Sequence, residues 1–218
     1  MTTDLNKFLD GLLAKYNGQP GATARFSMAP LSVTFCIDGS GSMLMDDILP
    51  NRFGATISAV QAFIGVRQRA GAGDLVSAVV FDSSATTISR LVPIHDAERR
   101  LLQPLRRVDA GGGTQITKGL LTTETILATS PNGNTRFVVL LSDGEDGGEP
   151  YYIADRMKAA GAIINCIGVG RRPVDVDESC LKRVCSKVDG DLRYRFISNA
   201  MDLASYFETL ATGLTRVQ

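Results

Sequence analysis

The stretch that most constrains the fold is residues 33–43, Val-Thr-Phe-Cys-Ile-Asp-Gly-Ser-Gly-Ser-Met. A short apolar strand pattern leads directly into three oxygen-bearing side chains at alternate positions, Asp38, Ser40 and Ser42. A strand that stays apolar to its end is typical of a parallel sheet buried on both faces. Open sheets of this kind bind ligands just beyond the carboxyl ends of their strands. The stretch therefore predicts an α/β fold in which these three side chains form half of a divalent-metal site.

Strand-like and helix-like segments alternate along the rest of the chain. Continuous apolar runs predict buried strands, and apolar residues at three- and four-residue steps predict helices. The predicted strands after the first are 75–81, 85–91, 136–141, 163–170 and 192–197. The predicted helices are 52–69, 96–103, 115–129, 150–160, 177–187 and 199–214.

The connection between strands 75–81 and 85–91 is too short for a crossover. Only Asp82, Ser83 and Ser84 join them, and so short a link permits only antiparallel pairing. The alternating order elsewhere predicts crossover connections with helices on both faces of the sheet. We therefore expect an α/β, doubly wound, Rossmann-like and mostly parallel sheet with one antiparallel edge strand.

Length and patterning predict one domain with an N-terminal extension. A chain of 218 residues with 44% hydrophobic content can bury one large core. Residues 4–17 place apolar side chains on one helical face, and Gly18 and Pro20 end that helix. We predict an amphipathic helix and linker at 1–29 and a single domain at 30–218. The helix either packs on the flank of the domain or joins two copies into a homo-oligomer.

Composition excludes several classes of protein. Lys+Arg 23 balances Asp+Glu 23, so nothing favours nucleic acid or an anionic membrane as partner. No apolar run reaches the roughly 18 residues of a membrane span, and no apolar signal core is visible. Four scattered cysteines do not resemble a disulfide framework. These features predict a cytoplasmic location, and the single histidine, His95, excludes His-cluster zinc sites.

Two further strand-end loops carry oxygen donors. Thr114 follows the glycines at 111–113, and Asp143 follows strand 136–141 by way of Ser142. Each residue alone fits an ordinary turn or helix cap, but their joint position at three strand-to-helix junctions favours a common site. Oxygen donors suit Mg²⁺, with Mn²⁺ or Ca²⁺ as alternatives. The predicted ligand set is Asp38, Ser40, Ser42, Thr114 and Asp143.

Enzymatic motifs with similar residues fit the sequence poorly. The Gly-Lys-Ser/Thr of a nucleotide P-loop is absent, and Pro173 stands where a dinucleotide loop after Gly168 and Gly170 needs its third glycine. No serine has glycines two residues before and after it, as an esterase elbow requires. Ser40 stands where phosphatases with a nucleophilic aspartate commonly have a second carboxylate. The residues therefore favour binding over catalysis.

The three-part motif closely resembles the von Willebrand factor A (vWA) domain family. Its parts are Asp38-x-Ser40-x-Ser42, Gly-Gly-Thr114 and Leu-Ser-Asp143-Gly. That family's metal-ion-dependent adhesion site uses a D-x-S-x-S motif, one threonine and one aspartate, so the resemblance implies a complete site of this kind. By the resemblance, the three hydroxyl groups would coordinate the ion directly. The two carboxylates would act mostly through waters or through hydrogen bonds to the direct ligands.

The resemblance covers about residues 30–214 and implies a protein-binding module rather than an enzyme. Neutral ligands leave a dication with an open position, which a Glu or Asp from a partner protein fills. By the same resemblance, loop 110–114 and helix 199–214 would move on ligation. Two other functions remain open: a metal-dependent hydrolase or phosphotransferase, and an intracellular scaffold whose metal is purely structural.

In showing no signal core and no further domain, the sequence resembles stand-alone bacterial vWA proteins. Such proteins often work beside AAA+ ATPases or in stress-response systems, so the resemblance implies a partner of one of these classes. Glu145, Asp146 and Glu149 make the rim acidic, which favours a partner acid surrounded by basic residues. Asp46 and Asp47 resemble the acidic pair of a second metal site in integrin β subunits, but the displacement by one residue disfavours a second ion.

Overall fold

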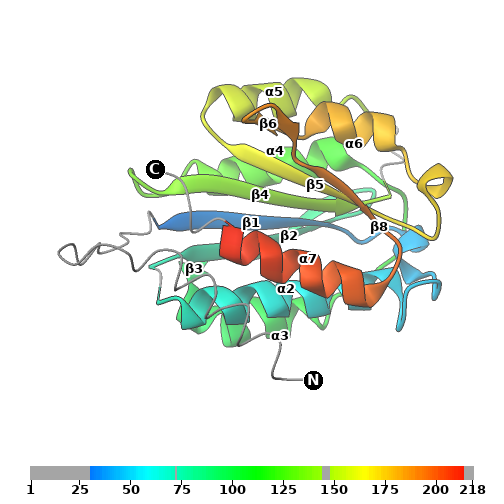
Figure 1. The fold of residues 1–218 in the computed structure, drawn as a ribbon, viewed down its shortest axis with the longest axis horizontal. Coiled ribbons are helices and arrows are strands. Elements are labelled where there is room, and N and C mark those ends of the chain that lie inside the picture. The colour runs from blue at the N-terminus through cyan, green and yellow to red at the C-terminus, as the bar shows by residue number, and fades with distance from the viewer. Residues whose placement is uncertain (1–29, 72, 144–147, 214–218) are drawn as a thin grey trace, which may run out of the picture.

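The computed structural model describes residues 30–71, 73–143 and 148–213. Within these residues one six-stranded sheet has the order β3-β2-β1-β4-β5-β8 (Figure 1). Its strands are β1 (Leu31–Asp38), β2 (Leu75–Phe81), β3 (Ala85–Pro93), β4 (Thr135–Ser142), β5 (Ile163–Val169) and β8 (Tyr194–Ile197). The edge strand β3 is antiparallel to β2, and the other neighbouring strands are parallel. The predicted sheet, with its one antiparallel edge strand, is confirmed.

Helices cover both faces of this sheet, as Figure 1 shows. One face carries α2 (Arg52–Arg69), η2 (Ile94–Asp96), η3 (Glu98–Leu102), α3 (Gln103–Leu105) and α7 (Ala200–Gly213). The other face carries α4 (Ile116–Leu127), α5 (Tyr151–Ala159) and α6 (Glu178–Val184). Each helical layer closes over its own buried apolar cluster, so the molecule has the three layers of a doubly wound α/β fold.

Strand β1 is the centre of the sheet, and all of its residues are buried. Its parallel neighbours are β2 on one side and β4 on the other. In the register, Asp38 lies opposite Phe81 and Ile37 lies opposite Leu141, so the carboxyl ends of the three strands reach the same edge. The strand order changes direction at β1, which makes this edge the position where open α/β sheets bind ligands.

Three phenylalanines fix the layer formed by α2 and α7. The rings of Phe35 and Phe63 meet edge to face, with centroids 5.4 Å apart. Phe207 of α7 lies 6.4 Å from Phe63 and 6.3 Å from Phe35, and all three side chains are fully buried. Such ring pairs add to the stabilisation from burial itself, and they hold α7 against both α2 and β1.

A buried ion pair lies at the amino-terminal ends of the central strands, opposite the edge that carries Asp38. Arg67 near the end of α2 donates from Nε to Asp74 Oδ2 at 2.6 Å and from Nη2 to Oδ1 at 2.9 Å. Asp74 Oδ1 also accepts a hydrogen bond from the backbone N–H of Leu31 at 2.8 Å. The pair therefore joins α2 to the first residues of β1 and β2.

Three predicted segments are wrong in detail. The strand expected at 192–197 begins only at Tyr194, the first residue of β8. The helix expected at 177–187 ends at Val184, and a small hairpin of β6 (Lys187–Val188) and β7 (Asp191–Leu192) follows it. Its turn is Asp189-Gly190, where both residues have positive φ values of 53° and 91°, as hairpin turns of this type require. The helix expected at 96–103 is divided among η2, η3 and α3.

The N-terminal helix predicted at 4–17 and the linker to residue 29 lie outside the described residues, so the boundary at residue 30 stays a prediction. No helix in the described part of the chain is long and apolar enough to cross a membrane. All four cysteines are buried, and none of them forms a disulfide.

Candidate metal centre

Asp38 closes β1 with a fully buried side chain that joins two loops. Its Oδ1 accepts a hydrogen bond from the backbone N–H of Ser40 at 2.8 Å. Its Oδ2 accepts one from the hydroxyl of Ser142, the last residue of β4, at 2.5 Å. The carboxylate therefore fixes the turn after β1 and ties it to the end of the neighbouring strand.

The two serine hydroxyls of the predicted site lie side by side on this turn. Ser40 Oγ and Ser42 Oγ are 3.1 Å apart, and Ser42 lies in η1 (Gly41–Leu44). Glycine at position 39 lets the backbone pass close to β2, because a Cβ there would lie 2.5 Å from Cγ1 of Val80. The turn thus presents two neutral oxygen donors close together, with Asp38 beneath them.

The loop that carries Thr114 is held against this turn by backbone hydrogen bonds. The N–H of Gly111 donates to the carbonyl of Gly39 at 2.6 Å, and the N–H of Gly41 donates to the carbonyl of Gly112 at 3.0 Å. Gly112 has a φ of +87°, a conformation that favours glycine. These bonds hold residues 111 and 112 against the turn that carries the serines, and the half-buried Thr114 follows on the same loop.

Asp143 completes the group from the end of β4, and its side chain is buried. Its Oδ2 lies 3.6 Å from Nη1 of Arg52. Its Oδ1 has no hydrogen-bond partner among the described residues. Buried carboxylate oxygens are normally paired, and leaving one unpaired is costly. The unpaired Oδ1 therefore indicates that Asp143 lacks a cation or a donor.

The electrostatics of Asp38 indicate the same need. Burial, and to a smaller degree the neighbouring Asp143, raises the pKa of Asp38 to about 6, although hydrogen bonds from Ser142 and Ser40 oppose the rise. The negative charge of a neighbouring carboxylate disfavours the ionised form of Asp38. A bound dication reverses this effect, because it becomes the largest local charge.

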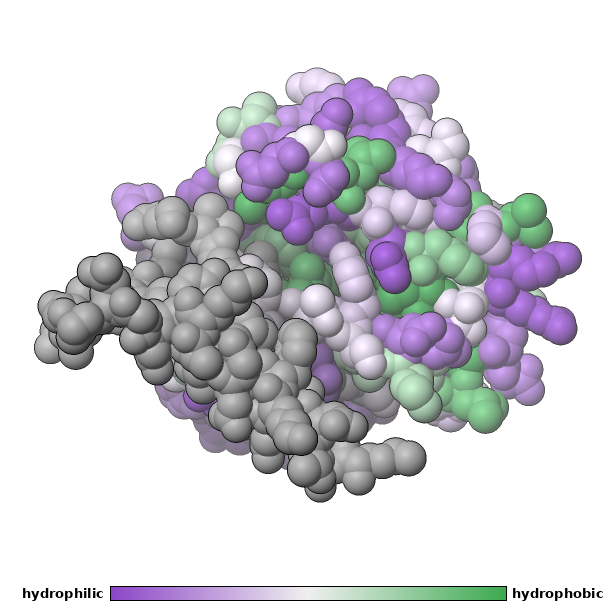
Figure 2. Space-filling view, in the orientation of Figure 1, coloured by the Kyte–Doolittle hydropathy of each residue, from purple (hydrophilic) through white to green (hydrophobic). Residues whose placement is uncertain are grey.

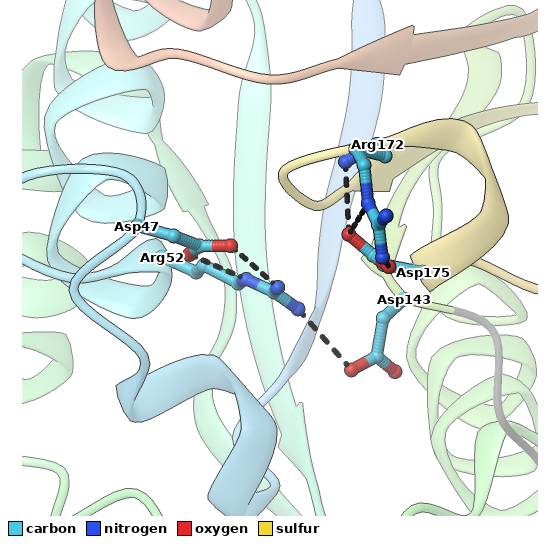
Figure 3. A network of polar contacts seen from close by, with 5 residues as sticks. All are labelled: Asp47, Arg52, Asp143, Arg172 and Asp175. Atoms are coloured by element: carbon cyan, nitrogen blue, oxygen red, sulfur yellow. Dashed lines mark hydrogen bonds and ion pairs between the residues drawn. The ribbon is translucent and has the colours of Figure 1, made fainter.

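Arg52, the first residue of α2, was not identified from the sequence. Its guanidinium is buried and donates from Nε and Nη2 to the two oxygens of Asp47 at 2.9 and 2.7 Å, while Nη1 faces Asp143 (Figure 3). This pairing lowers the pKa of Asp47. Asp47 is therefore engaged by an arginine and Asp46 is exposed. The one sequence feature that could have pointed to Arg52 is its charge at the start of a predicted helix, shortly after the acidic pair Asp46 and Asp47.

The donor set fits a hard divalent cation. Within residues 30–71, 73–143 and 148–213, no three carboxylate, imidazole or thiol side chains form a metal-ligating cluster. An ion here would rely on hydroxyl oxygens supported by Asp38 and Asp143, and oxygen donors suit Mg²⁺, Mn²⁺ or Ca²⁺. The structure brings the predicted residues to one edge of the sheet, and their role as metal ligands stays a prediction.

Comparison with known proteins identifies the family. The family model for the von Willebrand factor type A domain matches residues 33–145, slightly more than half of the chain. The chain belongs to the von Willebrand factor type A domain family. The matched range runs from β1 to just past Asp143, so this vWA domain carries its candidate site within the matched region.

Similar curated proteins are much longer than this vWA domain. It is 36% identical over 139 residues to calcium-activated chloride channel regulator 1 of Mus musculus, a match that covers 63% of this chain and 14% of that protein. It is 31% identical over 199 residues to calcium-activated chloride channel regulator 4 of Homo sapiens, covering 87% and 20%. The chain thus spans a fifth or less of these relatives.

Solved structures support the same fold. The vWF domain of the type V pili tip protein Mfa5 from Porphyromonas gingivalis superposes with a TM-score of 0.71 at 16% identity, covering 88% of this chain and 98% of that one. At this identity the likeness concerns the fold alone. Domains of this family are typically protein-interaction or adhesion modules.

Proposed function

We propose that this vWA domain binds Mg²⁺, with Mn²⁺ or Ca²⁺ as alternatives, and thereby binds an Asp or Glu of a partner protein. The direct ligands are the hydroxyl oxygens of Ser40, Ser42 and Thr114. Asp38 and Asp143 support them through waters or hydrogen bonds. A bound ion would supply an open coordination position that accepts a carboxylate oxygen of the partner.

The observation that carries this proposal is the unpaired Oδ1 of Asp143. It lies in a buried group with a second carboxylate, Asp38, whose pKa is raised, and the guanidinium of Arg52 lies 3.6 Å from the other oxygen, Oδ2. A cation at this place would stabilise both carboxylates at once. Since the neighbouring donors Ser40 and Ser42 are neutral, much of the ion's charge would remain available to an external carboxylate.

Substitution of Thr114 tests the metal site. We expect Thr114→Ala to weaken Mg²⁺ binding at least about tenfold and Thr114→Ser to restore it, because serine keeps the hydroxyl oxygen. The measurement is calorimetric titration together with the melting temperature in Mg²⁺ and in EDTA. Thr125→Ala is the matched control, because Thr125 lies on the exposed surface of α4, where its hydroxyl donates to the carbonyl of Leu121 at 3.0 Å.

Equal Mg²⁺ affinity in wild type and Thr114→Ala would contradict the ligand assignment. A pull-down in Mg²⁺ and in EDTA then tests the partner, with AAA+ ATPases and stress-response proteins as the predicted classes. Partner binding that is unchanged by EDTA would favour a scaffold with a structural metal. Turnover of a phosphate or carboxylic ester that stops on chelation would favour the hydrolase alternative.

A further inference from the structure

A groove extends from the candidate metal centre toward the turn after β5. It has a volume of about 780 Å³, within the range of sites that enclose a ligand or a peptide side chain. It is lined by Ser42 and Asp143 of the candidate metal centre and by Val174 and Asp175 of η4 (Pro173–Asp175), and the carbonyl of Asp143 accepts a hydrogen bond from the N–H of Asp177 at 2.7 Å. The remaining lining residues are Met45, Asp47, Arg52, Arg171 and Arg172. A partner carboxylate placed at the metal centre would therefore lead its neighbours into this groove.

The charges of the groove are balanced within the protein, with one exception. Asp47 pairs with Arg52, and Asp175 pairs with Arg172 at 2.8 Å (Figure 3). Arg171 is exposed and has no ion-pair partner among the described residues. The planar set of donors of an exposed guanidinium can bind a carboxylate from outside through two hydrogen bonds.

A bound dication would change the sign of this surface. The three aspartates and three arginines that line the groove cancel one another in charge, so an ion at the metal centre would leave a net positive groove. Opposite charge on the partner would then favour binding. Of the acidic rim expected from Glu145, Asp146 and Glu149, the first two lie outside the described residues. Glu149 is described and exposed, but it is not among the residues that line the groove, whereas Arg171 is.

Apolar side chains add a third element of recognition. Met45, just after η1, and Val174, in η4, both line the groove and are 53% and 80% exposed. Apolar and polar residues are mixed on the right-hand end of the molecule in Figure 2, where the parallel strands finish in Figure 1. Exposed apolar groups rimmed by charged residues are typical of interaction surfaces.

We propose that the groove binds a partner segment in which an apolar residue lies between two acidic residues. One acid occupies the metal centre, the apolar side chain contacts Met45 and Val174, and the second acid binds Arg171. This inference rests on the proposed function and adds to it the chemistry of the partner.

Peptide selection tests this specificity. Random twelve-residue peptides displayed on phage are selected against the wild-type domain in Mn²⁺, and in parallel against Arg171→Ala and Arg171→Glu. Wild type should select two acids flanking an apolar residue, Arg171→Ala only one acid, and Arg171→Glu a basic residue in place of the second acid. A two-acid peptide should bind Arg171→Ala about tenfold more weakly.

The controls separate this inference from the metal site. Arg107→Ala removes another exposed arginine and should leave the selected sequences unchanged, while cooperative urea unfolding checks that each variant is folded. Selected peptides with one acid regardless of residue 171, or no selected peptides, would overturn the inference alone. Peptides that lack acids or bind equally in EDTA would overturn the proposed function as well.

Discussion

Replacement of Asp38 by asparagine should stabilise the metal-free protein while abolishing metal binding. Burial raises the pKa of Asp38 from 3.8 to about 6. At 1.36 kcal/mol per pH unit, the ionised carboxylate destabilises the folded state by roughly 3 kcal/mol at neutral pH. Asparagine has the same shape without the charge, so most of this penalty should disappear.

The hydrogen bonds of Asp38 can largely be kept by asparagine. Its Oδ1 can accept from the N–H of Ser40, and its amide can donate to Oγ of Ser142 once that hydroxyl turns. Because the exchange of partners has some cost, we expect Asp38→Asn to gain about 1–3 kcal/mol in EDTA at pH 7.5. For a domain of this size that is a rise in melting temperature of roughly 2–12 °C.

The pH dependence of this stability difference follows from the raised pKa of Asp38. Because the folded-state pKa of Asp38 is raised, the folded wild type takes up a proton as the pH falls through about 6 and gains stability until the unfolded chain is also protonated near pH 4. The advantage of Asp38→Asn should therefore be largest at pH 7.5 and small at pH 4.5. Carboxylates with lowered pKa, such as Asp175, affect both proteins alike and cancel in the difference.

Urea unfolding at both pH values, in EDTA and in Mg²⁺, is the assay. In saturating Mg²⁺ the wild type should gain about 2.7 kcal/mol at one hundred times its Kd, and Asp38→Asn should gain nothing. Asp74→Asn is the contrasting control, because Asp74 is also buried but pairs with Arg67, and its loss should cost about 3 kcal/mol or more. The reasoning would be refuted if Asp38→Asn were less stable than wild type at pH 7.5. It would also be refuted if the difference in free energy of unfolding between the two proteins did not change with pH.

Two further substitutions test neighbouring features. Arg52→Met should raise Mg²⁺ affinity several-fold by calorimetry, because it removes a guanidinium 3.6 Å from Asp143. The double variant with Asp47→Asn should keep that gain, and an unchanged affinity in both would contradict it. Gly39→Ala should lower the free energy of unfolding by about 1–3 kcal/mol, because its Cβ would lie 2.5 Å from Val80 Cγ1; a neutral urea midpoint would show that the turn adapts.

Much of this fold could be predicted because its central strands are buried on both faces. The strand Leu75–Phe81 and the helix Arg52–Arg69 were predicted with the bounds they have, since continuous apolar runs and helical spacing give strong signals. The edge shared by Asp38 and Asp143 also followed from the sequence, because the carboxyl ends of parallel strands meet. Periodicity thus located the candidate site before any side-chain position was known.

The remaining features depend on information that periodicity does not contain. The contact from Arg52 to Asp143 depends on the path of a long side chain across two loops. The hairpin around Asp189 and Gly190 had a visible turn signal, but its strands are too short to show alternation. Within α3, Pro104 has no N–H to donate, and a π-helical turn precedes this helix at Glu98–Leu102.

The two hydrogen bonds between the Gly39–Gly41 turn and the Gly111–Gly112 loop involve main-chain atoms only. The spacing of the donors is therefore independent of which side chains stand at Ser40, Ser42 and Thr114. Those positions can be exchanged on a constant frame, in evolution or by engineering. Carboxylates at these three positions would turn a centre suited to an external ligand into a calcium site whose ligands all come from the domain itself.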